Sequence, residues 1–86
     1  MSTWRPTLHL NGTSRAALAD DWSAFSSALR EAESACERAS PNGRDYYPQG
    51  GDAIGGATRE HQARCKAVRA LREDANAMLE HIMDAP

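Results

Sequence analysis

Two long stretches of this chain place apolar residues at alternating steps of four and three. In the first stretch these positions are Leu18, Trp22, Phe25, Leu29, Ala32, Cys36 and Ala39. Such a heptad stripe keeps one face of a helix against a partner, so we expect an amphipathic helix over residues 13–40. Thr13 or Ser14 can cap its first turn, and Pro41 cannot continue it.

The second stretch repeats this spacing but carries two polar residues in the stripe. Its positions are Ile54, Ala57, His61, Arg64, Val68, Leu71, Ala75, Met78 and Ile82. We expect a second helix over residues 53–83, with Asp52 as its N-cap. Buried charges rarely lack a partner. His61 and Arg64 therefore either bind an anion in a cavity or bond to the preceding loop and lock it over the helix.

A short segment, residues 1–12, precedes the first helix and shows the spacing of extended backbone. Leu8 and Leu10 alternate with polar residues, but the segment is too short to form a sheet by itself. We expect an extended arm that packs Trp4, Leu8 and Leu10 on a helix or on a neighbouring subunit.

The pattern predicts an all-α fold, with one domain over residues 1–86 that forms an antiparallel two-helix hairpin with an extended N-terminal arm. Two helices bury little apolar surface, and the core of so small a chain rarely supplies more than about 3–5 kcal/mol. Trp22, Phe25 and Leu29 need cover beyond a single partner helix. We therefore expect a homo-oligomer that forms a symmetric helical bundle.

The composition narrows the classes of function. With 12 Asp+Glu against 10 Lys+Arg, the chain lacks the basic excess of a general nucleic-acid binder, so we expect no nucleic-acid partner. No apolar run approaches the roughly 20 residues of a membrane span. The first residues lack the apolar core of a signal peptide. We expect a cytoplasmic protein without a membrane partner, in which Cys36 and Cys65 stay reduced as small core hydrophobes.

The sequence shows no pattern typical of a catalytic or metal site. Cys36, Cys65, His9, His61 and His81 lack the paired close spacing of zinc sites, so we expect no metal ligands. Cys65 and His61 share a helix face, but a seam thiol without solvent access is inert. We assign the first helix's main acidic residues to a solvated face: Asp20, Asp21, Glu31, Glu33 and Glu37. We expect no enzyme activity, no catalytic residue and no cofactor.

The connection between the helices, residues 41–52, is the predicted functional loop. It exceeds the roughly 2–8 residues that join most neighbouring helices, and longer connections often carry function. Arg44 offers a planar fork of donors for phosphate, and Tyr46 and Tyr47 offer flat faces for a base. The second helix adds amide hydrogens at its start. The candidate ligand-binding residues are Arg44, Tyr46, Tyr47, Arg59, His61 and Arg64.

The alternative interpretation of the loop is structural. Asp45 would pair with Arg44 or cap a backbone amide, and the tyrosines would plug the open end of the hairpin. In both interpretations the loop returns the chain onto the first turns of the second helix. We therefore expect His61 and Arg64 to lie close to Arg44 and the tyrosines.

Three segments of the chain resemble a group of small proteins encoded by bacteriophages and prophages. They are residues 9–14 (His-Leu-Asn-Gly-Thr-Ser), 42–48 (Asn-Gly-Arg-Asp-Tyr-Tyr-Pro) and 60–64 (Glu-His-Gln-Ala-Arg). The resemblance implies a phage context and a location in the host cytoplasm. Small phage proteins of this size often counter bacterial immunity. Some are oligomeric helical sponges for nucleotide second messengers, and others plug a protein surface.

Two functions are consistent with these features. The first is a counter-defence binding protein whose oligomer sequesters a nucleotide-type immune signal without catalysis. The alternative is a small protein-binding module or inhibitor that masks a host protein surface. The first requires aromatic and basic side chains that converge on one site, and the second requires an exposed patch.

Overall fold

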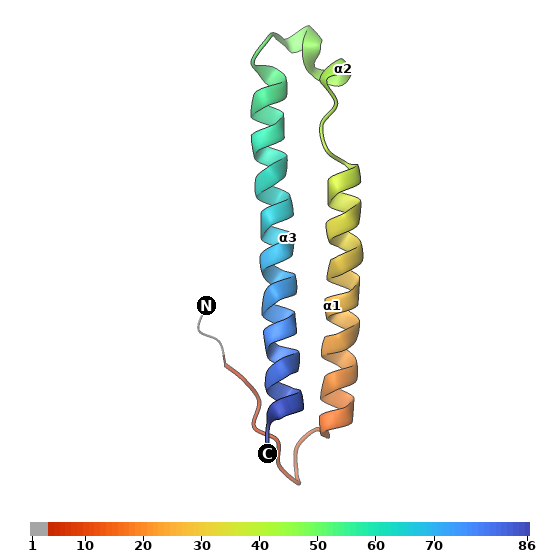
Figure 1. The fold of residues 1–86 in the computed structure, drawn as a ribbon, viewed down its shortest axis with the longest axis vertical. Helices are drawn as coiled ribbons and strands as arrows, with labels where there is room; N and C mark the ends of the chain where they lie inside the picture. Colours follow the sequence, from red (N-terminus) through yellow and green to blue (C-terminus); the bar gives the residue numbers. More distant parts are fainter. Residues whose placement is uncertain (1–3) are drawn as a thin grey trace.

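Figure 1 shows a computed structural model of the chain, which describes residues 4–86 as a helical hairpin. The long helices α1 (Arg15–Arg38) and α3 (Ala53–Asp84) run antiparallel and side by side. The connection holds two short helices, α2 (Gly43–Tyr46) and η1 (Tyr47–Gln49), at one end of the hairpin, called the loop end below. The predicted all-α hairpin with an N-terminal arm is confirmed, and no strand occurs in the part of the chain that the structure describes.

The helix ends follow the predicted caps to within two residues. The side-chain oxygen of Ser14 accepts a hydrogen bond from the amide of Ala17 at 3.1 Å, which satisfies one amide at the start of α1. At the start of α3, Asp52 occupies the N-cap position but makes no side-chain capping bond. The connection is more ordered than a plain loop, because the side chain of Asn42 caps α2 by accepting from the Arg44 amide at 2.9 Å.

Most positions of the predicted heptad stripes lie in the contact face between α1 and α3, but several are replaced there by a neighbouring residue. On α1 the more buried positions are Leu18, Ala19, Trp22, Ser26, Leu29, Glu33 and Cys36. The predicted seam residues Phe25, Arg64 and Leu71 are exposed instead. A straight helix drifts by about 20° per heptad from a strict seven-residue repeat, so a heptad stripe does not stay on one line of contact. The neighbours Ser26, Cys65 and Arg72 are more buried, and these polar or weakly polar residues enter the interface.

The apolar core lies toward the chain termini, where Ala75, Met78 and Ile82 of α3 are buried. Arg15, in the first turn of α1, closes this end. Its guanidinium donates to the backbone carbonyls of Ile82 at 3.0 Å, Met83 at 2.9 Å and Ala85 at 2.6 Å. The last four carbonyls of a helix lack intrahelical partners, so one side chain of α1 completes the end of α3 and fixes how far the two helices overlap.

Polar contacts continue along the middle of the hairpin. The hydroxyl of Ser26 donates to the amide oxygen of Asn76. The Glu33 carboxylate accepts from Nε of Arg69 at 3.1 Å and from the guanidinium of Arg72. The assignment of Glu33 to a solvated face was therefore wrong: its side chain is only 14% exposed and bridges two arginines of α3.

The N-terminal arm runs past the end of α3 (Figure 1). The ring nitrogen Nε2 of His81 lies 2.8 Å from the backbone carbonyl oxygen of Pro6 and holds the arm there. Trp4 and Leu10 are fully exposed, so these two side chains do not pack on a helix of their own chain. Packing on a neighbouring subunit stays a prediction, and residues 1–3 of the predicted arm lie outside the described residues.

Within residues 4–86, no helix combines the length and the apolar character that crossing a membrane requires.

The arginine contacts of Glu33 make the stability of the hairpin depend on pH. Hydrogen bonds from Arg72 and then Arg69 hold the pKa of Glu33 below its ordinary value of 4.5. Because the pKa of Glu33 is lower in the folded chain than in the unfolded chain, its arginine contacts stabilise the fold fully at any pH above the unfolded-state pKa. This stabilisation is lost as the pH falls through the folded-state pKa. We expect the thermal midpoint to fall as the pH drops below about 4.5, and to fall less steeply in Glu33→Gln.

The matched control for this prediction is Glu31→Gln, because Glu31 is an exposed carboxylate of the same helix. Thermal melts followed by circular dichroism between acidic and neutral pH measure both slopes. Equal slopes in the two variants would contradict the role assigned to Glu33.

Candidate functional site

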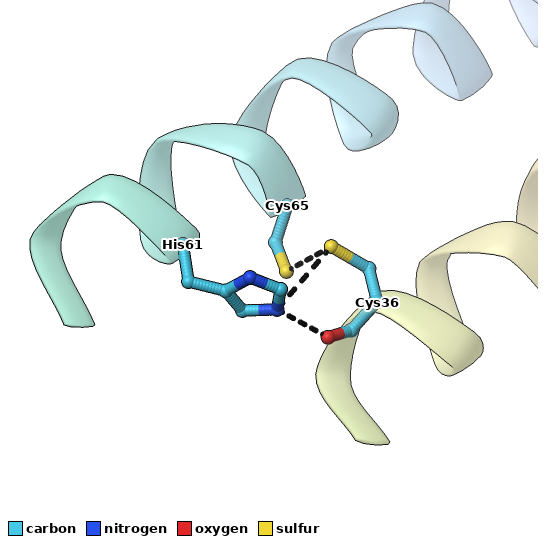
Figure 2. Close-up of side chains that lie close together, drawn as sticks. All are labelled: Cys36, His61 and Cys65. Atoms are coloured by element: carbon cyan, nitrogen blue, oxygen red, sulfur yellow. Dashed lines mark hydrogen bonds between the residues drawn. The ribbon is translucent and has the colours of Figure 1, made fainter. Parts of the chain in front are cut away.

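Two groups of reactive or ligand-binding side chains lie toward the loop end of the hairpin. The first, called the thiol–imidazole cluster below, consists of Cys36, His61 and Cys65 and lies between α1 and α3 (Figure 2). The second, called the loop set, consists of Arg44, Tyr46, Tyr47 and Arg59. The first group was not predicted from sequence, and the second contains four of the six predicted ligand-binding residues.

The thiol–imidazole cluster is built from the last turns of α1 and the first turns of α3. His61 and Cys65 are four residues apart on α3, which places them on one helix face opposite Cys36. The two Sγ atoms of Cys36 and Cys65 lie 2.6 Å apart, and Nε2 of His61 lies 3.6 Å from the Cys36 Sγ. All three ligand atoms lie within 4.8 Å of one another (Figure 2).

His61 is buried and its ring is held from both sides. Arg64 Nη1 lies 3.4 Å from Nδ1 of His61, and Nε2 contacts the backbone carbonyl oxygen of Cys36. A guanidinium has only donors, so Nδ1 accepts. The ring proton is therefore on Nε2, which donates to the carbonyl oxygen of Cys36. Arg64 itself is 62% exposed and lies 3.9 Å from the carboxylate of Glu60.

These contacts correct two predictions about the seam. His61 and Arg64 do not lock the loop, because His61 bonds to the backbone of α1 and Arg64 contacts His61 and Glu60. Arg64 does not face inward either, since the inward position on that turn belongs to Cys65. Of the predicted ligand-binding residues, the structure brings only His61 and Arg64 within hydrogen-bonding distance in residues 4–86.

The loop set is turned to solvent. Arg44, Tyr47 and Arg59 are exposed, with Tyr47 at 77%, and Tyr46 is half-buried. Within the described range 4–86, the side chains of these four residues make no hydrogen bond or ion pair, so the pairing of Asp45 with Arg44, one of the two structural roles considered for Asp45, is not formed. A left-handed Gly50, with φ of 114°, turns the chain from η1 toward α3.

The thiols of the cluster are neither core hydrophobes nor ordinary surface thiols. Both are half-buried. The hydrogen bond with Cys36, followed by desolvation, raises the pKa of Cys65 to about 11. A groove of about 510 Å³ passes beside the cluster, and its lining includes Glu37, Gln62 and Lys66 together with His61 and Cys65. Solvent and small ions can therefore reach the cluster, in which the pKa of the Cys65 thiol lies well above neutral pH.

The cluster could have been found by pairing positions across the hairpin. In an antiparallel hairpin centred near residue 50, Cys36 lies opposite residues about 14 positions beyond the centre, which is between His61 and Cys65. Zinc-site spacing along the sequence misses this arrangement, because folding rather than local sequence brings the third ligand atom into place.

No protein-family model, curated protein or solved structure matches this chain.

The raised pKa of Cys65 predicts slow alkylation near neutral pH, because the thiolate is the nucleophile. In the folded, reduced chain the rate of modification of Cys65 by iodoacetamide should keep rising with pH through 9, with a midpoint at about 11. Peptide mass spectrometry measures this rate. In the denatured chain the midpoint should return to an ordinary thiol value of about 8.5.

The variant Cys36→Ala tests the cause, because it removes the first contribution to the raised pKa. Its Cys65 midpoint should move down toward the ordinary value. A Cys65 midpoint near 8.5 in the folded wild-type chain would show that the contact between the two thiols does not form in solution.

Proposed function

We propose that this chain is a non-catalytic binding protein whose homo-oligomer captures an anionic, nucleotide-type signalling molecule, in a counter-defence role for a phage. The observation that carries the proposal is the loop set, whose cationic and aromatic side chains make no hydrogen bond or ion pair within residues 4–86. The guanidinium groups and the exposed ring of Tyr47 are therefore available to a ligand.

The chemistry of the loop end suits such a ligand. Arg44 and the exposed Arg64 provide guanidinium groups for phosphate oxygens. Arg59 adds a third guanidinium group. It lies beside the first turn of α3, because its Nη1 atom would be 3.4 Å from a Cβ atom placed on Gly55. Tyr46 and Tyr47 supply flat faces, and stacking a base on an aromatic ring contributes about 1–3 kcal/mol. In this proposal His61 does not contact the phosphate itself, because its own ring nitrogens are already engaged.

The shape of the chain supports self-association. Residues 4–86 form a rod-like hairpin, and the radius of gyration is 18.5 Å, against about 12 Å for a compact domain of this length. The chain exposes 6406 Å², which is roughly 1,400 Å² more than the surface expected for a compact monomer of its mass. That excess is larger than the roughly 800 Å² that each partner contributes to a standard protein interface.

One face of the hairpin is suited to that contact. Phe25 directly precedes the inward-facing Ser26 on α1, and Leu71 directly precedes the inward-facing Arg72 on α3. Antiparallel helices turn in opposite senses when viewed from one end, so both preceding residues point to the same side of the hairpin. Phe25 and Leu71 are each about half exposed there, and the ring of Phe25 contacts Trp22 edge to face at 5.8 Å between centroids. A second copy would cover this apolar face.

This face predicts a homo-oligomer at micromolar concentration. Light scattering should give a mass that is a multiple of 9.4 kDa. Phe25→Asp and Leu71→Asp should each shift the mass toward the monomer, because a buried interface does not accommodate an unpaired carboxylate. The control Ser27→Asp lies one residue beyond Ser26, on the opposite side of the hairpin, and should leave the mass unchanged. A wild-type chain that is monomeric at these concentrations would reject the proposed oligomer.

The ligand is tested by calorimetric titration with a panel of cyclic dinucleotides and ADP-ribose derivatives. We expect one class to bind, and we expect Arg64→Ala and Tyr47→Ala each to weaken binding by about tenfold or more, which corresponds to at least about 1.4 kcal/mol. Both variants should keep the wild-type oligomeric mass. Lys66→Ala is the matched control, because it removes an exposed cation of the same helix outside the proposed ligand site.

The same titration separates this proposal from the alternative of a protein-binding module. If no compound of the panel binds the wild-type chain, capture of a nucleotide-type signal is wrong. The apolar face of Phe25 and Leu71 would then be the better-supported functional surface, and a host protein its occupant.

A further inference from the structure

We propose that Cys36, His61 and Cys65 form a zinc-binding site that joins α1 to α3 near the loop end of the hairpin. This inference rests on different observations from the proposed function, because it concerns the interior of the hairpin rather than the exposed loop set, and the two sites meet at Arg64.

The donor atoms fit this metal. Two cysteine sulfurs and one imidazole nitrogen are ligands that zinc prefers, in a tetrahedral arrangement. With bonds of about 2.3 Å to sulfur and 2.0–2.1 Å to nitrogen, two ligand atoms on one tetrahedral ion lie roughly 3.5–3.8 Å apart. The Cys36 Sγ and His61 Nε2 already lie 3.6 Å apart. The sulfurs, at 2.6 Å, have to separate by about 1 Å, which a small χ1 rotation provides.

The backbone also suits a metal site. His61 and Cys65 are spaced as i and i+4 on α3, the spacing by which one helix face presents two ligands to one ion. Cys36 approaches from the facing helix, so the site would cross-link the hairpin (Figure 2). The groove beside Cys65 leaves room for water as a fourth ligand, and Glu37 lines the same groove. Three protein ligands with one open position are an established arrangement for zinc.

Arg64 determines which tautomer of His61 is present before zinc binds. Its contact with Nδ1 keeps the proton on Nε2, the nitrogen that would have to bind the ion. Zinc binding therefore needs that proton to move to Nδ1 and Arg64 to turn away. The guanidinium is 62% exposed and already lies near Glu60, so it can make this turn without disturbing the packing between the helices.

The thiols would lose their protons when they bind the ion, since thiolate is the form that ligates. Zinc binding should therefore release two protons for each chain near neutral pH, and the affinity should rise with pH.

The test uses the full-length chain, purified with a phosphine reductant, treated with a chelator and freed of both. Titration with Co²⁺ should produce the visible spectrum of a tetrahedral ion and the near-ultraviolet charge-transfer bands of two thiolates. The stoichiometry should be one ion for each chain, and Zn²⁺ should displace Co²⁺. Calorimetry in buffers of different ionisation enthalpy should count two protons released.

The variants identify the ligands. Cys36→Ser, Cys65→Ser and His61→Asn should each weaken Co²⁺ binding by about tenfold or more, in line with losing a ligand. His81→Asn is the matched control, because it removes a helical histidine whose bond is to the arm rather than to the cluster. Arg64→Ala should retain or tighten Co²⁺ binding while it weakens binding of the nucleotide-type ligand, so the two proposals can fail separately.

Several results would overturn the inference. They are a weak octahedral spectrum with the wild-type chain, equal Co²⁺ affinity in the double variant Cys36→Ser/Cys65→Ser, and one ion shared by two chains. A Cys36–Cys65 disulfide that dissolved oxygen forms even with one equivalent of Zn²⁺ present would also overturn it. If a variant loses its helical circular dichroism, the Co²⁺ spectrum and the proton count of the wild-type chain decide whether the site exists, because both report the thiolates directly.

Discussion

The structure depends on the pairing of two antiparallel helices along a single line of contact. Two helices can shield each other on one side only, so little of the chain is buried and the register between them has few apolar contacts to set it. Side-chain bonds supply that register. Arg15 binds the carboxyl end of α3, Glu33 bridges Arg69 and Arg72 in the middle, and His61 bonds to Cys36 near the loop end. Each bond joins positions that only one overlap of the helices brings together.

Periodicity was enough to predict the fold class, the two long helices and their connection. It was not enough to predict which side chains meet. Heptad counting placed Phe25, Arg64 and Leu71 in the seam, and the structure buries Ser26, Cys65 and Arg72 more deeply instead. Residues three and four positions along a helix lie about 60° to one side and about 40° to the other side of the starting residue, so a rotation of a few tens of degrees exchanges one set for the other. The apolar stripe is wider than one contact line, and local sequence does not determine which part of it faces the partner.

The same limit applies to the candidate sites. Arg44, Tyr46 and Tyr47 could be selected from residue type and position in the connection, and the exposure of Arg44 and Tyr47 agrees with a binding role. The thiol–imidazole cluster could not be selected from spacing along the chain, because 25 residues separate Cys36 from His61. Only the overlap of α1 and α3 brings their side chains together. A cluster formed across a hairpin can be predicted only when the register between the two helices is known. Here that register depends on long-range polar bonds.

Arg64 connects the inside of the hairpin with its outer surface. Its guanidinium can contact Nδ1 of His61, or it can turn outward to a phosphate. Turning outward weakens the contact with His61. If it turns outward, Nδ1 loses the donor that kept it unprotonated, and the proton of His61 can move there and leave Nε2 open to a metal ion. Under both proposals, an anionic ligand and zinc would therefore favour each other. Linkage makes this effect reciprocal, so zinc would raise the affinity for the anion by the same factor.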